Sequence, residues 1–272
     1  MKTVFALIAL SAVTAASAQG LYTTQGADVY KVNPNTVTLS FVGNTGMGNY
    51  RYESMTYHPG VGLVAIGFDA ATGENMVMDT IDPYTGVGLN RVNLGHGPTV
   101  GYWETIEYVS GFGLVVSKGT VDPLYSSQIG IMSLAGSYSP ISDNTLDNDE
   151  GAWDSTNDRF YFWDPNAVGQ FAETNLPTGV FTNRGAIPNT MGDGAWDPVA
   201  GKFYAVGVSN LRTLFDVSVI ANVANSNNLG TFAGNGDLDG MAYVPVPEPA
   251  SLIVMGLGGA FLAKAARRRR KS

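Results

Sequence analysis

The chain has 272 residues, of which 44% are hydrophobic, so it can form a large core and is not globally disordered. It contains no Cys, which excludes disulfides, thiolate nucleophiles and Cys-bound metals. The formal charge of −8 is unevenly spread, because residues 19–248 hold all 23 Asp and Glu but only 8 of the 15 Lys and Arg, a net charge of −15. Such a body repels nucleic acid and anionic lipid and attracts cations or basic partners.

The first 18 residues, MKTVFALIALSAVTAASA, contain the three parts of a secretory signal peptide. Lys2 supplies a positive charge, residues 4–13 form an apolar stretch, and residues 16–18 give the small-x-small cleavage pattern. We therefore expect signal peptidase to cut between Ala18 and Gln19. The alternative, an uncleaved membrane helix, needs about 20 apolar residues, which is more than this stretch provides.

One pattern then recurs along the chain. Its copies are ESMTYHPGVGLVAIG from Glu53, ETIEYVSGFGLVVSKG from Glu104, DEGAWDSTNDRFYFWD from Asp149, GDGAWDPVAGKFYAVG from Gly192, and a final DLDGMAYVP. Aligned on one aromatic position, the copies superpose Tyr57, Tyr108, Trp153, Trp196 and Tyr243, at spacings of 51, 45, 43 and 47 residues. Repeats of this length with several short strands each are typical of β-propeller blades.

Each copy is expected to contain four strands. Residues 62–67 and 202–207 exemplify the second strand, residues 76–86 a third strand ending in a DPYTG turn, and residues 88–95 a fourth. The segment LRTLFDVSVIANVANSNN comes nearest to a helical period, but it is also consistent with a strand that runs into a polar loop.

The two ends of the body complement each other. The last copy supplies only a first strand, and residues 20–43 supply three more, so together they predict a fifth blade that closes the ring without an open sheet edge. We therefore predict an all-β propeller of five four-stranded blades over residues 19–245. This pattern resembles bacterial repeat propellers of the NHL and YVTN type in architecture alone. A β-sandwich, or a propeller with more irregular blades, is the alternative.

Acidic residues precede the repeat aromatic in every copy. They stand four positions before it, or three in the fourth copy: Glu53, Glu104, Asp149, Asp193 and Asp239. If the first strands surround the axis, these carboxylates meet at one mouth of the ring, where they could bind a hard cation such as Ca²⁺. Alternatively, each acid accepts a backbone N–H in its own loop. Residues 235–240, NGDLDG, also match the start of a calcium loop, but the acid at its twelfth position is missing.

The body carries no catalytic motif. His58 and His96 are the only histidines, and no nucleophile motif such as G-x-S-x-G accompanies them, so we expect no enzymatic activity. Of the four tryptophans, Trp153 and Trp196 hold the repeat position and are expected between blades. Trp103 and Trp163 are then the freer candidates for stacking on sugars.

The chain ends in VPEPASLIVMGLGGAFLAKAARRRRKS, residues 246–272. Pro247, Glu248 and Pro249 are followed by a short apolar segment that predicts a membrane helix. A cluster of Arg267, Arg268, Arg269 and Arg270 follows, and these arginines are expected to stay on the cytoplasmic side. The alternative is a basic tail on a surface helix.

This three-part order resembles the PEP-CTERM sorting signal of Gram-negative bacteria. The resemblance implies transient anchoring in the inner membrane, cutting near Pro-Glu-Pro by an exosortase, and release to the cell surface or the extracellular polysaccharide matrix. We expect an interaction or structural protein that binds polysaccharide or another surface protein. An extracellular propeller enzyme acting on polysaccharide, and a body that is merely carried by the sorting tail, are the alternatives.

Overall fold

The computed structural model describes most of the body. The described residues are 19–95, 102–119, 127–143, 150–164, 170–178, 180–187, 191–207, 212–220 and 223–245. Their regular elements are β-strands, and none of them forms a helix long and apolar enough to cross a membrane. The predicted signal peptide and the predicted C-terminal membrane helix lie outside these residues.

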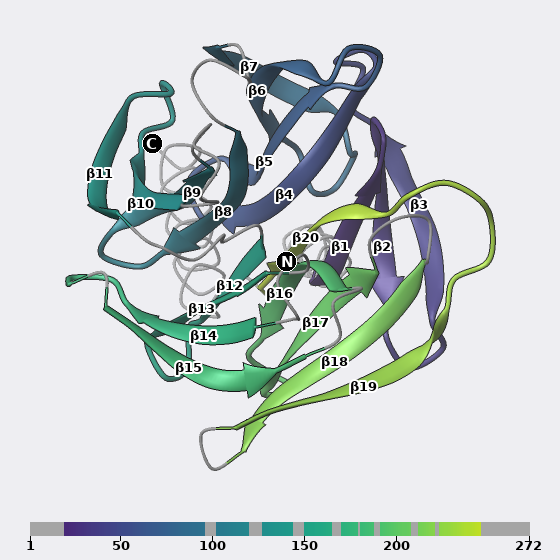
Figure 1. Ribbon diagram of the computed structural model, residues 1–272. Helices are drawn as coiled ribbons and strands as arrows, with labels where there is room; N and C mark the ends of the chain where they lie inside the picture. Colours follow the sequence, from purple (N-terminus) through teal and green to yellow (C-terminus); the bar gives the residue numbers. More distant parts are fainter. Residues whose placement is uncertain are drawn as a thin grey trace, which may run out of the picture. The chain divides into compact units, whose positions relative to one another are not determined.

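The strands form five antiparallel sheets of four, arranged around a common axis (Figure 1). From the innermost strand outward, blade 1 contains β20 (Asp239–Val244), β1 (Gly20–Gln25), β2 (Asp28–Asn33) and β3 (Thr38–Asn44). Blade 2 contains β4 (Tyr50–His58), β5 (Gly62–Asp69), β6 (Glu74–Ile81) and β7 (Gly88–Gly95). Blade 3 contains β8 (Trp103–Val109), β9 (Gly113–Gly119), β10 (Ser127–Met132) and β11 (Tyr138–Asp143). Blade 4 contains β12 (Glu150–Asp154), β13 (Arg159–Asp164), β14 (Gln170–Asn175) and β15 (Val180–Ala186). Blade 5 contains β16 (Met191–Asp197), β17 (Lys202–Gly207), β18 (Thr213–Ile220) and β19 (Val223–Thr231).

Blade 1 is built from both ends of the body, as the sequence predicted. Strand β20 pairs with β1, although more than 200 residues separate them. The hydroxyls of Thr23 and Thr24 both donate to the carbonyl oxygen of Asp239, at 3.0 and 2.7 Å, and are fully buried. The predicted five-bladed, four-stranded propeller is therefore confirmed, and this pairing closes the ring.

Aspartates close the tight turns that connect the strands. Asp82 accepts the backbone N–H groups of Tyr84 and Thr85, and Asp197 in blade 5 accepts those of Val199 and Ala200. A short acidic side chain that bonds two residues onward offers the backbone a turn in place of a continued strand. The predicted DPYTG turn thus forms for the expected chemical reason.

The outermost strand of a blade is its least buried strand. Five of the eight residues of β5 are buried, whereas most residues of β19 are exposed or half-buried. The segment LRTLFDVSVIANVANSNN contains the expected strand, β18, but its polar end is not a loop, because VANSNNLGT forms the outermost strand of blade 5 and pairs with β18 from Ile220↔Val223 to Thr213↔Thr231. An outermost strand needs backbone pairing but few apolar side chains, since much of its surface faces water.

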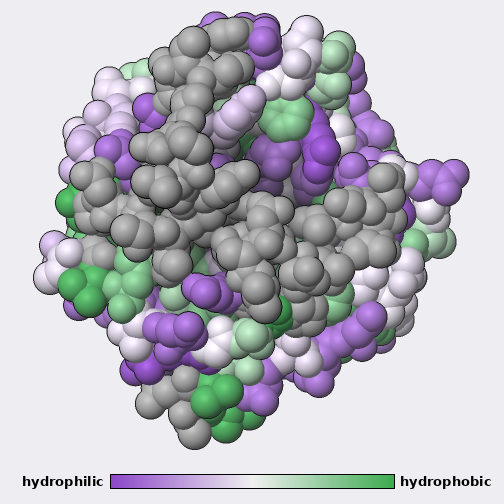
Figure 2. Space-filling model, in the orientation of Figure 1, coloured by the Kyte–Doolittle hydropathy of each residue, from purple (hydrophilic) through white to green (hydrophobic). Residues whose placement is uncertain are grey.

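The apolar core lies between the blades. One cluster joins Trp163 and Phe171 of blade 4 to Phe203 and Phe215 of blade 5. The ring of Phe171 stacks on that of Trp163 and meets Phe203 edge-on. Figure 2 shows described residues on one face of the body, where hydrophobic side chains gather in small separate groups among hydrophilic ones. The buried apolar side chains therefore hold neighbouring sheets together.

The inner strands define two faces of the propeller. They begin at the strand-start face, with Tyr50, Trp103, Glu150, Met191 and Asp239. They end at the strand-end face, with His58, Val109, Asp154, Asp197 and Val244. Glu53, Glu104 and Asp239, three of the predicted acidic positions, stand in the first half of their inner strands, near the strand-start face.

Candidate functional site

Irregular pairing positions the acidic residues at the strand-start face. The pairing register shifts between Tyr52 and Ser54 in β4, between Trp103 and Ile106 in β8, and between Met191 and Gly194 in β16. A bulge of this kind inserts an extra residue and turns the following side chains to new directions. The shifts span Glu53, Glu104 and Asp193, so regular alternation along the strand does not predict where these carboxylates point.

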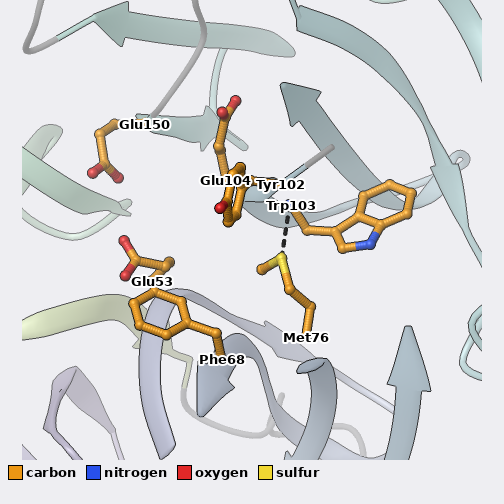
Figure 3. Close-up of a pocket in the computed structure, with 7 residues that line it drawn as sticks. All are labelled: Glu53, Phe68, Met76, Tyr102, Trp103, Glu104 and Glu150. Atoms are coloured by element: carbon orange, nitrogen blue, oxygen red, sulfur yellow. Dashed lines mark hydrogen bonds between the residues drawn. The ribbon is translucent and has the colours of Figure 1, made fainter. Parts of the chain in front are cut away.

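Three glutamates from consecutive blades line one pocket of about 260 Å³. These are Glu53 of β4, Glu104 of β8 and Glu150 of β12. Figure 3 shows the carboxylates of Glu53 and Glu150 pointing into the same space, whereas that of Glu104 points away from Glu53. A Cβ atom added to Gly119 would lie 2.1 Å from Glu104 Oε1, so this carboxylate packs against β9.

The rest of the glutamate pocket is apolar and aromatic. Its other lining residues are Phe68, Met76, Tyr102 and Trp103. Tyr102 is 43% exposed, while Trp103 is buried, with its indole directed away from the carboxylates (Figure 3). The Trp103 backbone N–H donates to the sulfur of Met76 at 3.2 Å, which ties β8 to blade 2. A ligand here would meet carboxylates on one side and aromatic surface on the other.

Glu53 also belongs to an ion-pair network with Arg51. The Arg51 guanidinium donates twice to Asp239, at 2.9 and 3.0 Å, and lies 3.6 Å from Glu53 and 3.7 Å from Asp237. Burial raises the pKa of Glu53 to about 7; the negative charge of Asp239 adds to this, and Arg51 opposes it. The Glu53 side chain is 30% exposed and borders the pocket, where it can meet a ligand.

Asp193 has a structural position on the axis. It is 2% exposed and accepts Ser54 Oγ–H at 3.0 Å, the Met55 N–H at 3.2 Å and the Met241 N–H at 2.6 Å. Burial raises its pKa well above the usual range, and these hydrogen bonds oppose the rise. Asp193 therefore joins β16 to β4 and β20. This is close to the second interpretation of the acids, except that Asp193 bonds the backbone of two other blades as well as that of its neighbour Gly194.

A second axial carboxylate, Glu107, was missed by the sequence analysis. It accepts Thr56 Oγ–H at 2.6 Å and the backbone N–H groups of Tyr108 and Trp153, and burial raises its pKa. Thr56 Oγ1 in turn accepts the Tyr108 N–H, just as Ser54 Oγ accepts that of Ile106. The hydroxyl of Ser54 thus links the Asp193 carboxylate to β8. The hydroxyl of Thr56 joins β4 to Glu107 and Tyr108 of β8. The available signal was an acid directly before Tyr108 inside an apolar strand.

The described acids that were predicted to bind one cation lie at three separate places. Glu53 and Glu104 line the pocket, Asp239 pairs with Arg51, and Asp193 lies on the axis. Asp149 lies outside the described residues, and its neighbour Glu150 lines the pocket. Within the described part of the chain, no three Asp, Glu or His side chains come close enough to hold a metal ion.

The partial calcium loop is organised by an arginine. Arg212 donates to the carbonyl oxygens of Asn235 and Gly236 at 3.0 and 2.9 Å, and to that of Ala233 at 3.0 Å. Its side chain also bonds Gln25 Oε1 at 3.2 Å. A guanidinium therefore holds the first two main-chain carbonyls of this loop, while the Asp237 and Asp239 carboxylates lie beside Arg51.

The histidine and tryptophan predictions have different outcomes. His58 is a turn residue whose Nδ1 accepts the Gly60 N–H and whose ring meets Tyr108, while His96 lies outside the described residues. The prediction that Trp103 and Trp163 are the freer tryptophans is wrong, because they are 5% and 2% exposed. Strand β13 is covered on both faces, so Trp163 is enclosed there and donates to the Gly192 carbonyl at 3.1 Å. Trp153 and Trp196 pack between blades, as expected, but stay half-buried.

Comparisons with known proteins identify the tail. Residues 245–271 match the PEP-CTERM protein-sorting motif, a range that contains Pro247, Glu248, Pro249 and the four arginines. No curated protein matches the chain. Similar solved structures include a mitotic checkpoint complex (12% identity, 77% of this chain and 76% of that chain, TM-score 0.46). A putative oxidoreductase (glucose dehydrogenase) from Thermus thermophilus is 13% identical over 79% of this chain and 81% of that chain, with a TM-score of 0.46. TolB from Acinetobacter baumannii is 10% identical over 83% of this chain and 66% of that chain, with a TM-score of 0.48.

The sorting motif and the body together define what the chain is. The motif implies export, membrane anchoring during sorting, and processing by an exosortase. The body that precedes it is a ring of five four-stranded blades. The protein is therefore an exported five-bladed β-propeller that carries a PEP-CTERM sorting motif.

Proposed function

We propose that the propeller is an interaction module of the cell surface or extracellular polysaccharide matrix, and that its pocket at Glu53 and Glu150 binds an amino sugar of a matrix polysaccharide. The sorting motif supports the destination. The observation that supports the ligand is the convergence of carboxylates from consecutive blades on one aromatic-walled pocket. Residues 19–248, with a net charge of −15, also attract cationic polymers before contact.

The dimensions of the pocket favour an organic cation over a metal ion. Calcium requires six to eight oxygens at about 2.3–2.6 Å, and the described residues contain no suitable group of three ligands. A pocket of about 260 Å³ lies near the lower end of the volumes typical of small-molecule sites, about 300–1,000 Å³, and so matches a small ligand such as a single sugar ring. A protonated amino group would pair with Glu53 or Glu150, while the exposed ring of Tyr102 contacts the apolar face of the sugar.

Two matched ligands test this proposal. A hexamer of glucosamine and a hexamer of N-acetylglucosamine have the same rings but differ in charge, and calorimetry with the purified protein compares their binding. We expect only the charged hexamer to bind, and we expect Glu150→Gln to weaken it at least tenfold. Glu74→Gln, which removes an acid of β6 outside the pocket, should bind like the wild type. Equal binding of the two hexamers would contradict the proposed role of the carboxylates.

A second candidate function is polysaccharide hydrolysis. The observation in its favour is the pKa of Glu53, about 7, because a glycosidase needs one protonated and one ionised carboxyl group beside its substrate. Glu150 would then act as the second carboxylate. If the protein releases reducing ends from either hexamer and Glu53→Gln does not, the protein is a hydrolase. If both hexamers stay intact after prolonged incubation, the result supports a binding module.

Calcium binding can be tested in the same preparation. The thermal midpoint is measured in millimolar calcium and in excess chelator. Because an ion that binds only the folded state stabilises it, a bound calcium raises the midpoint. An unchanged midpoint would show that the folded protein does not bind calcium at millimolar concentration.

A further inference from the structure

The strand-end face contains two grooves, each with a half-buried tryptophan. The first has a volume of about 400 Å³ and lies between blades 4 and 5. Blade 5 contributes Trp196, Phe203 and Ser218, and blade 4 contributes Arg159 and Tyr161. It therefore combines aromatic rings with hydroxyl and guanidinium groups.

The second groove has a volume of about 310 Å³ and lies between blades 3 and 4. Blade 4 contributes Trp153, Asp158 and Asn175, and blade 3 contributes Ser110 and Phe112. This groove also places polar side chains next to an aromatic surface, here with a carboxylate and an amide.

The two grooves occupy equivalent places in successive blades. Trp153 and Trp196 are each the penultimate residue of an inner strand and stand 43 residues apart. Each groove is completed by the turn or second strand of the preceding blade and by the end of the third strand of its own blade, at Asn175 and Ser218. Because two equivalent cavities lie in successive blades, a chain of repeating units can place one unit in each.

The chemistry of the grooves suits a neutral sugar ring. The Trp196 ring is held in place, since its Nε1–H donates to Thr156 Oγ1 at 3.1 Å and its centroid lies 4.7 Å from that of Phe203. A fixed indole offers a flat apolar surface to the C–H face of a pyranose, at little entropic cost. Ser218 and Arg159 can bond the hydroxyl groups at the ring edge. Arg159 makes one groove positive and Asp158 makes the other negative. A ligand that enters both grooves is therefore not selected for a charge of either sign.

We propose that the grooves at Trp153 and Trp196 bind uncharged sugar rings of a polysaccharide. The proposal rests on the proposed function in taking a matrix glycan as the partner, but it uses different residues on the opposite face. The glutamate pocket would select amino groups, whereas the grooves hold neutral units. One propeller can then contact a polymer at several points, which raises its overall affinity.

The experiment uses the full-length protein on an array of neutral, amino and acidic hexasaccharides. We expect binding to at least one neutral hexasaccharide, with at least tenfold weaker binding for Trp196→Ala and for Trp153→Ala. Tyr84→Ala is the matched control, because Tyr84 is 50% exposed on a turn outside both grooves, and it should bind like the wild type. Trp196→Phe keeps the packing against Phe203 and should retain partial binding if an alanine variant fails to fold.

Quenching of tryptophan fluorescence by iodide gives a readout that needs no variant. Trp103 and Trp163 are buried, so quenching reports on Trp153 and Trp196, and the bound neutral hexasaccharide should protect them. Unchanged quenching, or wild-type binding by both alanine variants, would overturn the inference. If the tryptophan variants keep all binding while Glu150→Gln loses the glucosamine hexamer, the inference fails and the proposed function stands. Binding to no glycan on the array would overturn both.

Discussion

The hydrogen bonds that Asp193 accepts on the axis allow the stability lost on its removal to be calculated. Asp193→Ala leaves three buried donors without an acceptor: Ser54 Oγ–H, Met55 N–H and Met241 N–H. A buried unsatisfied donor costs about 1–3 kcal/mol. The substitution also removes a carboxyl group whose ionisation is disfavoured by burial, which offsets part of this cost. We therefore expect the free energy of unfolding to fall by about 3 kcal/mol.

Urea denaturation followed by circular dichroism measures this change. At a slope of about 2–3 kcal/mol per molar urea, a loss of about 3 kcal/mol moves the midpoint down by roughly 1 M. Asp193→Asn keeps an oxygen for the two backbone donors, so we expect less than half of the loss. Glu74→Ala, on β6 away from the axis, should stay within about 0.5 kcal/mol of the wild type. If Asp193→Ala unfolds at the same urea concentration as Glu74→Ala, then this carboxylate does not hold the inner strands together.

Three further outcomes are expected. Arg91→Leu should lower the free energy of unfolding by about 3–5 kcal/mol, because it leaves the fully buried Asp79 without the guanidinium that donates to both its oxygens. Urea denaturation measures this change, and a loss below about 1 kcal/mol would refute the reasoning. Glu53 has a pKa raised to about 7, so its protonated form favours the fold and its contribution is lost as pH rises from about 4.5 through 7. Glu53→Gln should therefore reduce the fall in thermal midpoint between pH 5 and pH 8, and an unchanged fall would exclude Glu53 as its source. Gly43→Ala should lower the thermal midpoint by several degrees, because the added Cβ would lie 1.9 Å from the carbonyl oxygen of Thr85 in the next blade. A thermal midpoint equal to that of the wild type would show that the two blades move apart at this contact without cost.

The outcome for individual strands shows where sequence patterns are informative. The ranges expected for the strands at residues 88–95 and 202–207 coincide with β7 and β17. Both are bounded by turn residues, which mark strand ends through local chemistry. Strand β19 was missed because its sequence, VANSNNLGT, is polar. Its pairing with β18 comes from backbone hydrogen bonds, which leave no trace in side-chain hydrophobicity.

The acids were recognised as a group, but their separate roles were not. A count from the repeat aromatic assumes regular alternation, and the register shifts in β4, β8 and β16 break that alternation at the acidic positions. Asp193 turns to the axis, and Glu150 lines the pocket although its strand pairs without such a shift. Glu107, which lies outside the aligned set, joins Asp193 on the axis. The tryptophans were misjudged for a related reason, since exposure depends on which neighbouring blade covers a side chain.

The sequence by itself determined the sorting motif, the number of blades and the closure of the ring. These features depend on short linear motifs and on the spacing of repeats, so they can be read without knowing which residues touch. Only the tertiary structure decided which carboxylates share a pocket, which lie buried on the axis, and which tryptophans border a groove. Those properties depend on strand register and on contacts between blades, which join residues that are far apart in the chain.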